Sequence, residues 1–373
     1  MLGGSSMRLN LYYDEKDESV VVNLGLFDHR RYVVRAMVPP GYEAYFQEQA
    51  RYTSAHTSTA IEGNPLGHET AMLVLAGETD VHSSAGVEKV NLNQAYEFVA
   101  LLASDKSTKI DEGLIRTMNS IVLKGLPDQQ ARNRGKYRVG QNLVVDSDTR
   151  EIRYRPPPPE SVPELMGQLG SEIARWMEQH PAPIAAALAH FGLISIHPFD
   201  EGNGRTARLV ADMVLDLKGW SIDGMLAVSK VMLDRRSEYY ASLREAQGDE
   251  FTENVNTTPF VRFHTDALAM AAARLEDRVV AFNKRRDAWI KQIPALNPRQ
   301  VTALMFMVDI GPLSTSVYAR LTRSSQATAL ADLSQLLSLD VVVREGAGRN
   351  TRYRLHPELA RDGEEGSQEG ESR

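Results

Sequence analysis

The densest group of side chains able to do chemistry lies between residues 197 and 208, which read HPFDEGNGRTAR. Pro198 stops the apolar helix expected before it, and Gly202 and Gly204 can adopt backbone angles that other residues avoid. Successive backbone N–H groups in such a loop can turn inward and bind an anion at the start of the next helix. The segment therefore predicts a polyphosphate-binding loop between two helices.

The charged residues of this segment fit the same chemistry. Arg205 and Arg208 are three residues apart, so both project from one face of the next helix and add two positive charges. Glu201 would repel a bare phosphate, and this conflict disappears if Mg²⁺ bridges the carboxylate and the phosphate oxygens. His197 lies where an imidazole could accept a proton from an incoming hydroxyl group.

The segment does not fit GxxxxGK[ST] or GxGxxG, but it resembles the Fic family signature HxFx[D/E]GNGRxxR at every specified position. The resemblance implies an enzyme that binds ATP and Mg²⁺, transfers AMP to a Ser, Thr or Tyr hydroxyl of a target protein or of itself, and releases pyrophosphate. His197 would be the general base, Glu201 would bind the metal, and Phe199 would anchor the loop. The nucleotide-binding residues implied in the motif are Gly202, Asn203, Gly204, Arg205, Thr206, Ala207 and Arg208.

Two further segments resemble the family more loosely. Tyr154, Arg155 and Pro156 resemble the end of the flap that aligns the target chain. Tyr239, Tyr240 and Gln247 resemble the helix that lines the nucleoside pocket. The alternative interpretation of the tyrosine pair is one core and one surface aromatic residue on a helix.

A second short motif, STAIEG at residues 58–63, predicts regulation. Ser58 and Glu62 are four residues apart on a helix that ends at Gly63, so Glu62 faces the unfavourable negative end of that helix. It is either exposed to solvent or held by a cation. The motif resembles the [S/T]xxxE[G/N] inhibitory helix of Fic proteins, which implies that Glu62 pairs with Arg208 and prevents productive placement of ATP.

The elements that must position these residues are mainly helical. Apolar periodicity predicts helices at 110–122 and 162–177, and further helices at 42–61, 87–102, 204–218, 231–246 and 259–288. Residues 136–155, with Asp146, Ser147 and Asp148 at the turn, predict a hairpin that projects from the bundle. The expected fold is a mainly α Fic bundle with a β-hairpin flap and a C-terminal winged helix-turn-helix.

The C-terminal part predicts a separate unit. Helices at 298–308, 314–321 and 325–337 precede a two-stranded wing at 341–355. Seven arginines face four acidic residues between 297 and 355, which leaves DNA binding open. Winged helices of this kind often serve protein docking or dimerisation instead, and we favour that role.

Length and composition set the outer limits. A chain of 373 residues predicts two to three domains, and the absence of cysteine excludes disulfides and thiolate chemistry. No membrane or signal segment is evident, so we expect a cytoplasmic protein. The expected divisions are an expression scar (1–6), a region with the inhibitory helix (7–105), the catalytic core (106–290), the winged helix (291–357) and a disordered acidic tail (358–373). The competing functions are a DNA-binding regulator with a Fic sensor domain and a Fic enzyme that removes AMP.

Overall fold

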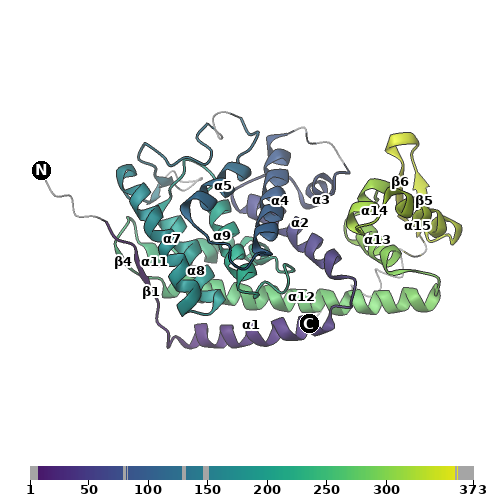
Figure 1. The fold of residues 1–373 in the computed structure, drawn as a ribbon, viewed down its shortest axis with the longest axis horizontal. Coiled ribbons are helices and arrows are strands. Elements are labelled where there is room, and N and C mark those ends of the chain that lie inside the picture. Colours follow the sequence, from purple (N-terminus) through teal and green to yellow (C-terminus); the bar gives the residue numbers. More distant parts are fainter. Residues whose placement is uncertain are drawn as a thin grey trace, which may run out of the picture.

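The computed structural model describes residues 7–78, 81, 83–127, 132–145, 151–357 and 359. Within these ranges the chain is mainly helical, as the periodicity predicts (Figure 1). The expected scar at 1–6, the turn residues Asp146, Ser147 and Asp148, and nearly all of the acidic tail lie outside the described residues. No helix in the described ranges combines the length and apolar composition needed to cross a bilayer.

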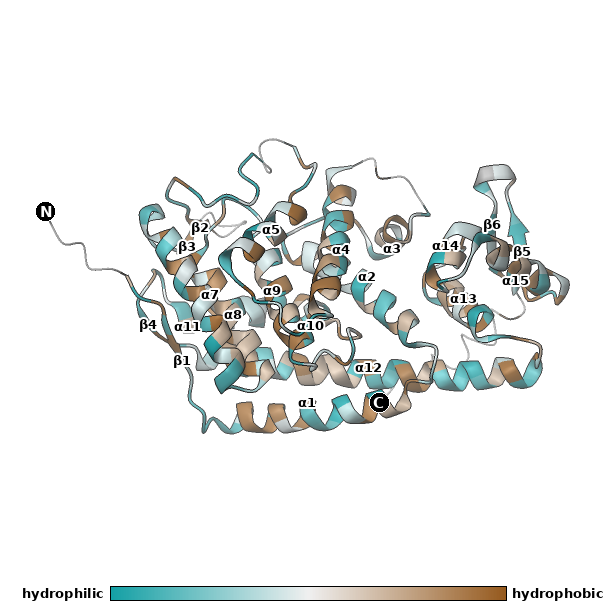
Figure 2. Ribbon diagram, viewed as in Figure 1, coloured by the Kyte–Doolittle hydropathy of each residue, from teal (hydrophilic) through white to brown (hydrophobic). Residues whose placement is uncertain are grey.

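The centre of the bundle is α8 (Ala182–Ile196). Fourteen of its fifteen residues are buried, because alanine and other apolar residues occupy every face of the helix. It packs against α7 (Val162–Gln179), α9 (Asn203–Leu217) and α12 (Thr258–Gln292). In Figure 2 its apolar character appears as pale to brown colour. A helix enclosed in this way fixes the point at which the loop after Ile196 begins.

The other helices of the bundle cover this centre. They are α1 (Glu18–Met37), α2 (Glu43–Ile61), α3 (His68–Ala76), α4 (Ser84–Ala103), α5 (Glu112–Val122), α10 (Val228–Asp234) and α11 (Arg236–Gln247). Helices α1 and α12 lie side by side along one edge of the molecule (Figure 1). The single helix predicted at 231–246 is wrong, because the chain breaks at Arg235, whose guanidinium pairs with Asp266 and Glu238. Helices α1 and α3 were not predicted.

Short strands join distant parts of the chain. Strand β1 (Asn10–Tyr12) pairs in parallel with β4 (Asn254–Asn256) and ties the N-terminal region to the start of α12. The predicted hairpin is confirmed as β2 (Val144–Val145) paired antiparallel with β3 (Ile152–Tyr154). A 3₁₀ turn, η1 (Pro159–Ser161), leads from the hairpin into α7. The hairpin therefore stands beside the N-terminal end of α7.

The C-terminal unit has the predicted order of elements. Helices α13 (Pro298–Asp309), α14 (Thr315–Leu321) and α15 (Gln326–Ser338) precede β5 (Val342–Glu345), η2 (Gly348–Asn350) and β6 (Arg352–Leu355). Strands β5 and β6 pair antiparallel, and Leu313 adds a bridge to Tyr353. The unit lies at the far end of α12 (Figure 1). The winged-helix assignment stays a prediction that this order favours.

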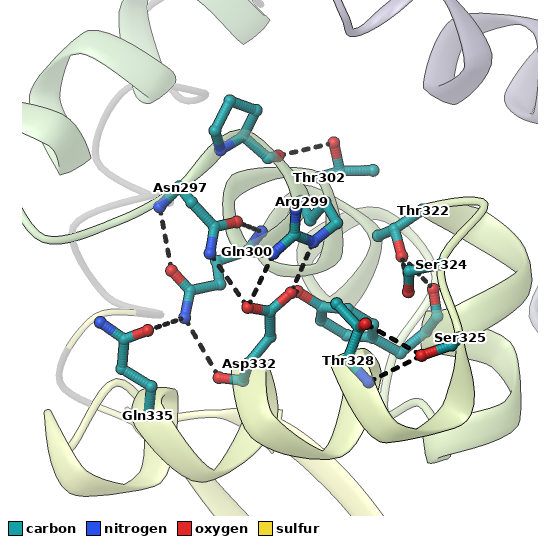
Figure 3. Close-up of polar contacts among 12 residues, drawn as sticks. Asn297, Arg299, Gln300, Thr302, Thr322, Ser324, Ser325, Thr328, Asp332 and Gln335 are labelled. Atoms are coloured by element: carbon teal, nitrogen blue, oxygen red, sulfur yellow. Dashed lines mark hydrogen bonds and ion pairs between the residues drawn. The ribbon is translucent and has the colours of Figure 1, made fainter.

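Polar contacts fix the helices of this unit to one another (Figure 3). Asp332 of α15 accepts hydrogen bonds from Arg299 (2.7 Å), Asn297 (3.0 Å) and the Tyr318 hydroxyl (2.9 Å). Asn297 also caps α13 through a capping box with Gln300. Asp332 therefore joins all three helices through one carboxylate.

Candidate active site

The loop between α8 and α9 has a fixed shape. His197 ends α8 in the left-handed region with φ 50°, and Gly202 precedes α9 with φ 78°. The Asn203 side chain accepts from the backbone N–H of Phe199 (2.9 Å) and donates to its carbonyl (2.8 Å). Phe199 is 1% exposed, so its predicted role as the anchor of the loop is confirmed. These bonds hold residues 199–203 as one closed turn.

Three of the predicted nucleotide-binding residues help to build the loop. Both ends of the Asn203 amide bond to Phe199, the Thr206 hydroxyl donates to the carbonyl of Gly202 (2.8 Å), and Ala207 is buried. The side-chain polar atoms of Asn203 and Thr206 therefore satisfy buried backbone groups of the loop. The backbone N–H of Thr206 also donates to the carbonyl of Gly202 (2.9 Å), so the N–H groups that could face an anion are those before it, in the first turn of α9. Nucleotide binding by these residues stays a prediction.

Two residues that the sequence analysis missed hold this loop from outside. Arg138 is 2% exposed and donates to the carbonyls of His197 (2.9 Å), Gly140 (3.1 Å) and Pro157 (2.5 Å). Asn119 is fully buried and donates to the carbonyl of Glu201 (2.9 Å). Asn119 interrupts the apolar face of a predicted helix, which was a usable signal, but no local pattern marks Arg138.

His197 is a neutral imidazole at neutral pH. Burial lowers its pKa to about 4, and the nearby charge of Arg138 acts in the same direction. The carbonyl of Ile194 and the carboxylate of Glu62 oppose this shift only in part. A neutral imidazole keeps a lone pair, so His197 can accept a proton at pH 7.

Glu201 lies in a negatively charged neighbourhood. Burial raises its pKa, Arg205 lowers it, and the carboxylates of Glu62 and Glu88 raise it further. Its side chain reaches the surface, unlike those of the two arginines. A cation bound beside Glu201 would relieve this repulsion.

The first motif arginine, Arg205, is a buried cation with open donors. It is 6% exposed, and its Nε and Nη1 atoms have no hydrogen-bond partner among the described residues. The carboxylate paired with it is Glu88 of α4, at 3.8 Å. This distance gives electrostatic attraction without a hydrogen bond.

The second motif arginine, Arg208, contacts the predicted inhibitory helix through its Nε and Nη2 atoms, while its Nη1 atom has no hydrogen-bond partner among the described residues. Its guanidinium donates to the Ser58 hydroxyl (2.8 Å), the Ser58 carbonyl (2.9 Å) and the Glu62 carboxylate (2.7 Å). Burial opposes the charge of Arg208, but Glu62 outweighs burial and raises the pKa of Arg208. The predicted contact between Glu62 and Arg208 is confirmed.

The same helix end closes over the loop. Gly63 follows Glu62 with φ 90°, a left-handed conformation that suits glycine. A Cβ atom added to Gly204 would overlap the Glu62 carboxylate, so that carboxylate lies directly on the start of α9. Burial would raise the pKa of Glu62, but the charges of Arg208 and Arg205 lower it overall. Glu62 is therefore ionised at the start of α9, beside Arg208 and Arg205.

The predicted nucleoside-pocket residues have different positions. Tyr239 is 1% exposed and its hydroxyl contacts His190 Nε2 at 3.0 Å, so it is the core residue of the pair, and its place in a nucleoside pocket stays a prediction. Tyr240 is half-buried, and its hydroxyl lies 3.5 Å from the carbonyl of Ile61, beside the inhibitory helix end. Gln247 is buried at the C-terminal end of α11.

The predicted flap residues form the base of the hairpin. The hydroxyl of Tyr154 donates to the carbonyl of Ser195 (2.8 Å) and its side chain is buried, so it anchors the hairpin and does not face a target. Arg155 pairs through its backbone with Asp249 and Phe251, and the carbonyl of Pro156 accepts from Gln141.

The comparisons with known proteins agree with this geometry. Residues 109–215 match the Fic/DOC family, and residues 298–356 match the DIP2311-like transcriptional regulator family, C-terminal domain. A Fic family protein from Desulfovibrio desulfuricans has a similar structure, with a TM-score of 0.57 and 25% identity, covering 92% of this chain and 98% of that chain.

Two sequence relatives carry printed activities. "Protein adenylyltransferase Fic" of Nematostella vectensis is 28% identical over 225 residues, which are 59% of this chain and 46% of that protein. "Protein adenylyltransferase fic-1" of Caenorhabditis elegans is 32% identical over 228 residues, which are 57% of this chain and 39% of that protein. The chain thus matches less than half the length of these relatives. Residues 109–215, the part of this chain that matches the Fic/DOC family, contain the loop and both of its arginines.

Proposed function

We propose that the protein transfers AMP from ATP to a Ser, Thr or Tyr hydroxyl of a target protein or of itself. The hydroxyl oxygen bonds to the α-phosphorus, the bond to the β-phosphate oxygen breaks, and pyrophosphate leaves. The observation that carries the proposal is the neutral imidazole of His197 beside a loop with two buried arginines, Arg205 and Arg208. The adenylyltransferase relatives support the same reaction.

His197 and the loop have separate tasks in this reaction. The lone pair of His197 accepts the hydroxyl proton as the oxygen attacks. The backbone N–H groups at Gly202 and Gly204 face the phosphates at the N-terminal end of α9, where the helix dipole favours negative charge. Arg205 and, once released, Arg208 bind the distal phosphates.

The site fits Mg²⁺ as a partner of ATP. The described residues contain no cluster of three or more His, Cys, Asp or Glu side chains able to form a protein cage for a metal. One carboxylate completed by substrate phosphates is a common arrangement for Mg²⁺. Glu201 would hold the ion, which neutralises charge on the phosphates. The crowding of Glu201 with Glu62 and Glu88 supports this assignment.

The resting protein is autoinhibited in this proposal. Glu62 occupies Arg208 with a hydrogen-bonded ion pair, so a distal phosphate must displace it before ATP can bind productively. Replacing Glu62 with Gly removes the competitor and frees the guanidinium. Glu62→Gln keeps the shape, removes the charge and activates in part.

The experiment measures incorporation of labelled AMP at fixed ATP by the wild type, Glu62→Gly, Glu62→Gln and Arg208→Ala. Glu62→Gly raises self-modification and target modification, and Arg208→Ala lowers both. The double variant behaves like Arg208→Ala, because Glu62 acts through that arginine. Loss of all incorporation in EDTA checks the metal. Folded Glu62→Gly protein that transfers no more AMP than wild type would refute the inhibitory role.

The match to a transcriptional regulator family favours a second function, DNA binding by the C-terminal unit. The helix at the position of a recognition helix argues against it, because α15 contains no Lys or Arg and its one charged residue, Asp332, is turned into the polar network of Figure 3. We therefore propose that this unit docks a protein. A gel shift that shows tight, strongly salt-dependent DNA binding by the full chain would reverse this preference.

A further inference from the structure

The two motif arginines differ in how their donors are used. Arg208 makes three hydrogen bonds to Ser58 and Glu62, and among the described residues its Nη1 atom alone lacks a partner. Arg205 is equally enclosed, yet its Nε and Nη1 atoms find no hydrogen-bond partner in the described part of the chain. An unsatisfied buried guanidinium is costly, so its donors are suited to an anionic ligand.

The carboxylate that faces Arg205 is held in turn by the inhibitory segment. Glu88 lies 3.8 Å from Arg205 through one oxygen, and its other oxygen accepts from Asn64 Nδ2 at 2.8 Å. Asn64 comes two residues after Glu62 and also donates to the carbonyl of Ala85 (2.9 Å). One loop, residues 62–64, therefore contacts Arg208 directly and reaches Arg205 through Glu88.

The neighbouring residue on α4 strengthens this attachment. Lys89 is fully buried and donates to the Thr59 hydroxyl (2.9 Å) in the last turn of α2. It also lies 3.1 Å from His56 Nδ1 and 3.4 Å from the His56 carbonyl. Helix α4 thus holds the end of α2 through Lys89 and the loop that follows it through Glu88.

We infer that Glu88 is a positioning residue that sets the phosphate affinity of Arg205. Asn64 couples Glu88 to the Glu62–Arg208 ion pair. At rest each arginine has one carboxylate, and a polyphosphate must compete with both. Because 3.8 Å is beyond hydrogen-bond reach, Glu88 acts on Arg205 by charge and does not fix its rotamer. The inference rests on the proposed use of ATP.

The first test compares the Michaelis constant for ATP in a Glu62→Gly background, where transfer is measurable. Adding Glu88→Gln lowers this KM by about threefold or more, because one negative charge beside the phosphates is lost, and leaves kcat within about twofold. Glu88→Asp keeps the charge, so its KM for ATP stays closer to that of the Glu62→Gly protein. Glu97→Gln, on the same helix and paired with Arg51, is the matched control without effect. An unchanged or raised KM for Glu88→Gln overturns the inference.

The second test exchanges the two groups of the Asn64–Glu88 hydrogen bond in otherwise wild-type protein. Asn64→Asp places two carboxylates in contact, so their repulsion speeds hydrogen–deuterium exchange in residues 58–66 and raises AMP transfer. The double variant Asn64→Asp with Glu88→Gln restores a donor and an acceptor, and its exchange returns towards wild type. Thermal melts confirm that each variant is folded. No change in exchange for Asn64→Asp, or no recovery in the double variant, contradicts the coupling.

The two failures can be told apart. If Glu62→Gly incorporates no AMP, the proposed reaction is wrong, and hydrogen–deuterium exchange still decides whether Asn64 and Glu88 hold the loop. If Glu62→Gly is active but Glu88→Gln leaves its KM unmoved, the reaction stands and the role of Glu88 is wrong.

Discussion

At the scale of single residues, the site is organised around compensated charge. Glu62 faces Arg208 and Glu88 faces Arg205, so each motif arginine has a carboxylate beside it. His197 remains the uncharged member of the group because burial lowers its pKa. In the proposed function, such a site would resist polyphosphate until one carboxylate moves, and the proposed base would stay neutral throughout.

The pH dependence of transfer follows from His197. Its pKa is lowered to about 4, so the imidazole stays neutral as the pH falls through 6.5, where an ordinary histidine takes up a proton. In Glu62→Gly the loss of a nearby carboxylate lowers this pKa further. We expect kcat/KM of that variant to stay level from pH 8 to about pH 5. An inflection near pH 6.5 would contradict the assignment of His197 as the base.

His197→Ala should lose AMP transfer by about 10²–10⁴-fold while still binding ATP.

Arg138 is expected to matter for both stability and catalysis. Arg138→Met keeps much of the volume but leaves the carbonyls of His197, Gly140 and Pro157 without their buried donor. Denaturant unfolding should show a loss of about 3 kcal/mol. AMP transfer should fall more than ATP affinity, because the carbonyl of His197 and the hairpin base lose a common support. Arg175→Met, at an exposed ion pair with Glu172, is the control and should cost less than about 0.5 kcal/mol.

At the scale of elements, apolar periodicity was sufficient for most of the bundle and for the hairpin. Helix α8 could be predicted because its apolar run is continuous, and α5 because its apolar face is regular. Helix α1 was not predicted because Val21, Val22 and Leu26 are apolar but exposed, so its sequence does not separate a buried face from an exposed one. The break at Arg235 depends on Asp266, which is distant in sequence. Such contacts leave no local pattern.

The residues of the site also fall into those that a local sequence pattern marks and those that depend on distant contacts. The loop, His197 and the Glu62–Arg208 contact could be predicted because they belong to two short motifs. Arg138, Asn64 and Glu88 could not, because each acts through a partner on another element. Tyr239 is a further case, since its residue type and position did not reveal that its hydroxyl contacts a buried histidine.

Asp332 gives a prediction for the C-terminal elements. Burial opposes its charge, but Arg299, Tyr318 and Asn297 outweigh burial and hold its pKa below the usual 3.8. Its contribution to stability is therefore present at neutral pH and is lost as the pH falls through this lowered pKa. Asp332→Asn should reduce the free energy of unfolding of the unit by about 1–3 kcal/mol at pH 7. The difference from wild type, measured by denaturant unfolding, should shrink at pH 3, and an equal difference at both pH values would count against this view.

At the scale of the whole molecule, the C-terminal unit contacts α2, the helix that ends before Glu62, and the residue that follows α3 and its terminal glycine. Glu78, just after α3, accepts from the backbone N–H of Ser314 (2.6 Å) and pairs with Arg352. The hydroxyl of Tyr45, in the first turn of α2, donates to Asp309 of α13. The Tyr45 contact lies at the opposite end of α2 from Glu62.

A chain that ends at residue 295 should therefore stay folded and inhibited. The Glu62–Arg208 contact joins α2 to α9 and is supported from α4, and all three helices precede residue 295, so ATP binding persists and Glu62→Gly still activates. Thermal melts and labelled ATP check both statements. If the shortened chain transfers AMP with Glu62 intact, the C-terminal unit contributes to the inhibition.

The order of elements along the chain also has a consequence for synthesis. Strand β1 needs β4 as its partner and α1 needs α12, so the core cannot close until residues near 256 and beyond have left the ribosome. At about 5–20 residues per second, this separation corresponds to roughly 10 to 50 seconds of elongation. Helix α2 and Glu62 emerge well before residues 197–208. Under the proposed autoinhibition, each newly made molecule therefore already contains its inhibitory helix when the loop at residues 197–208 emerges.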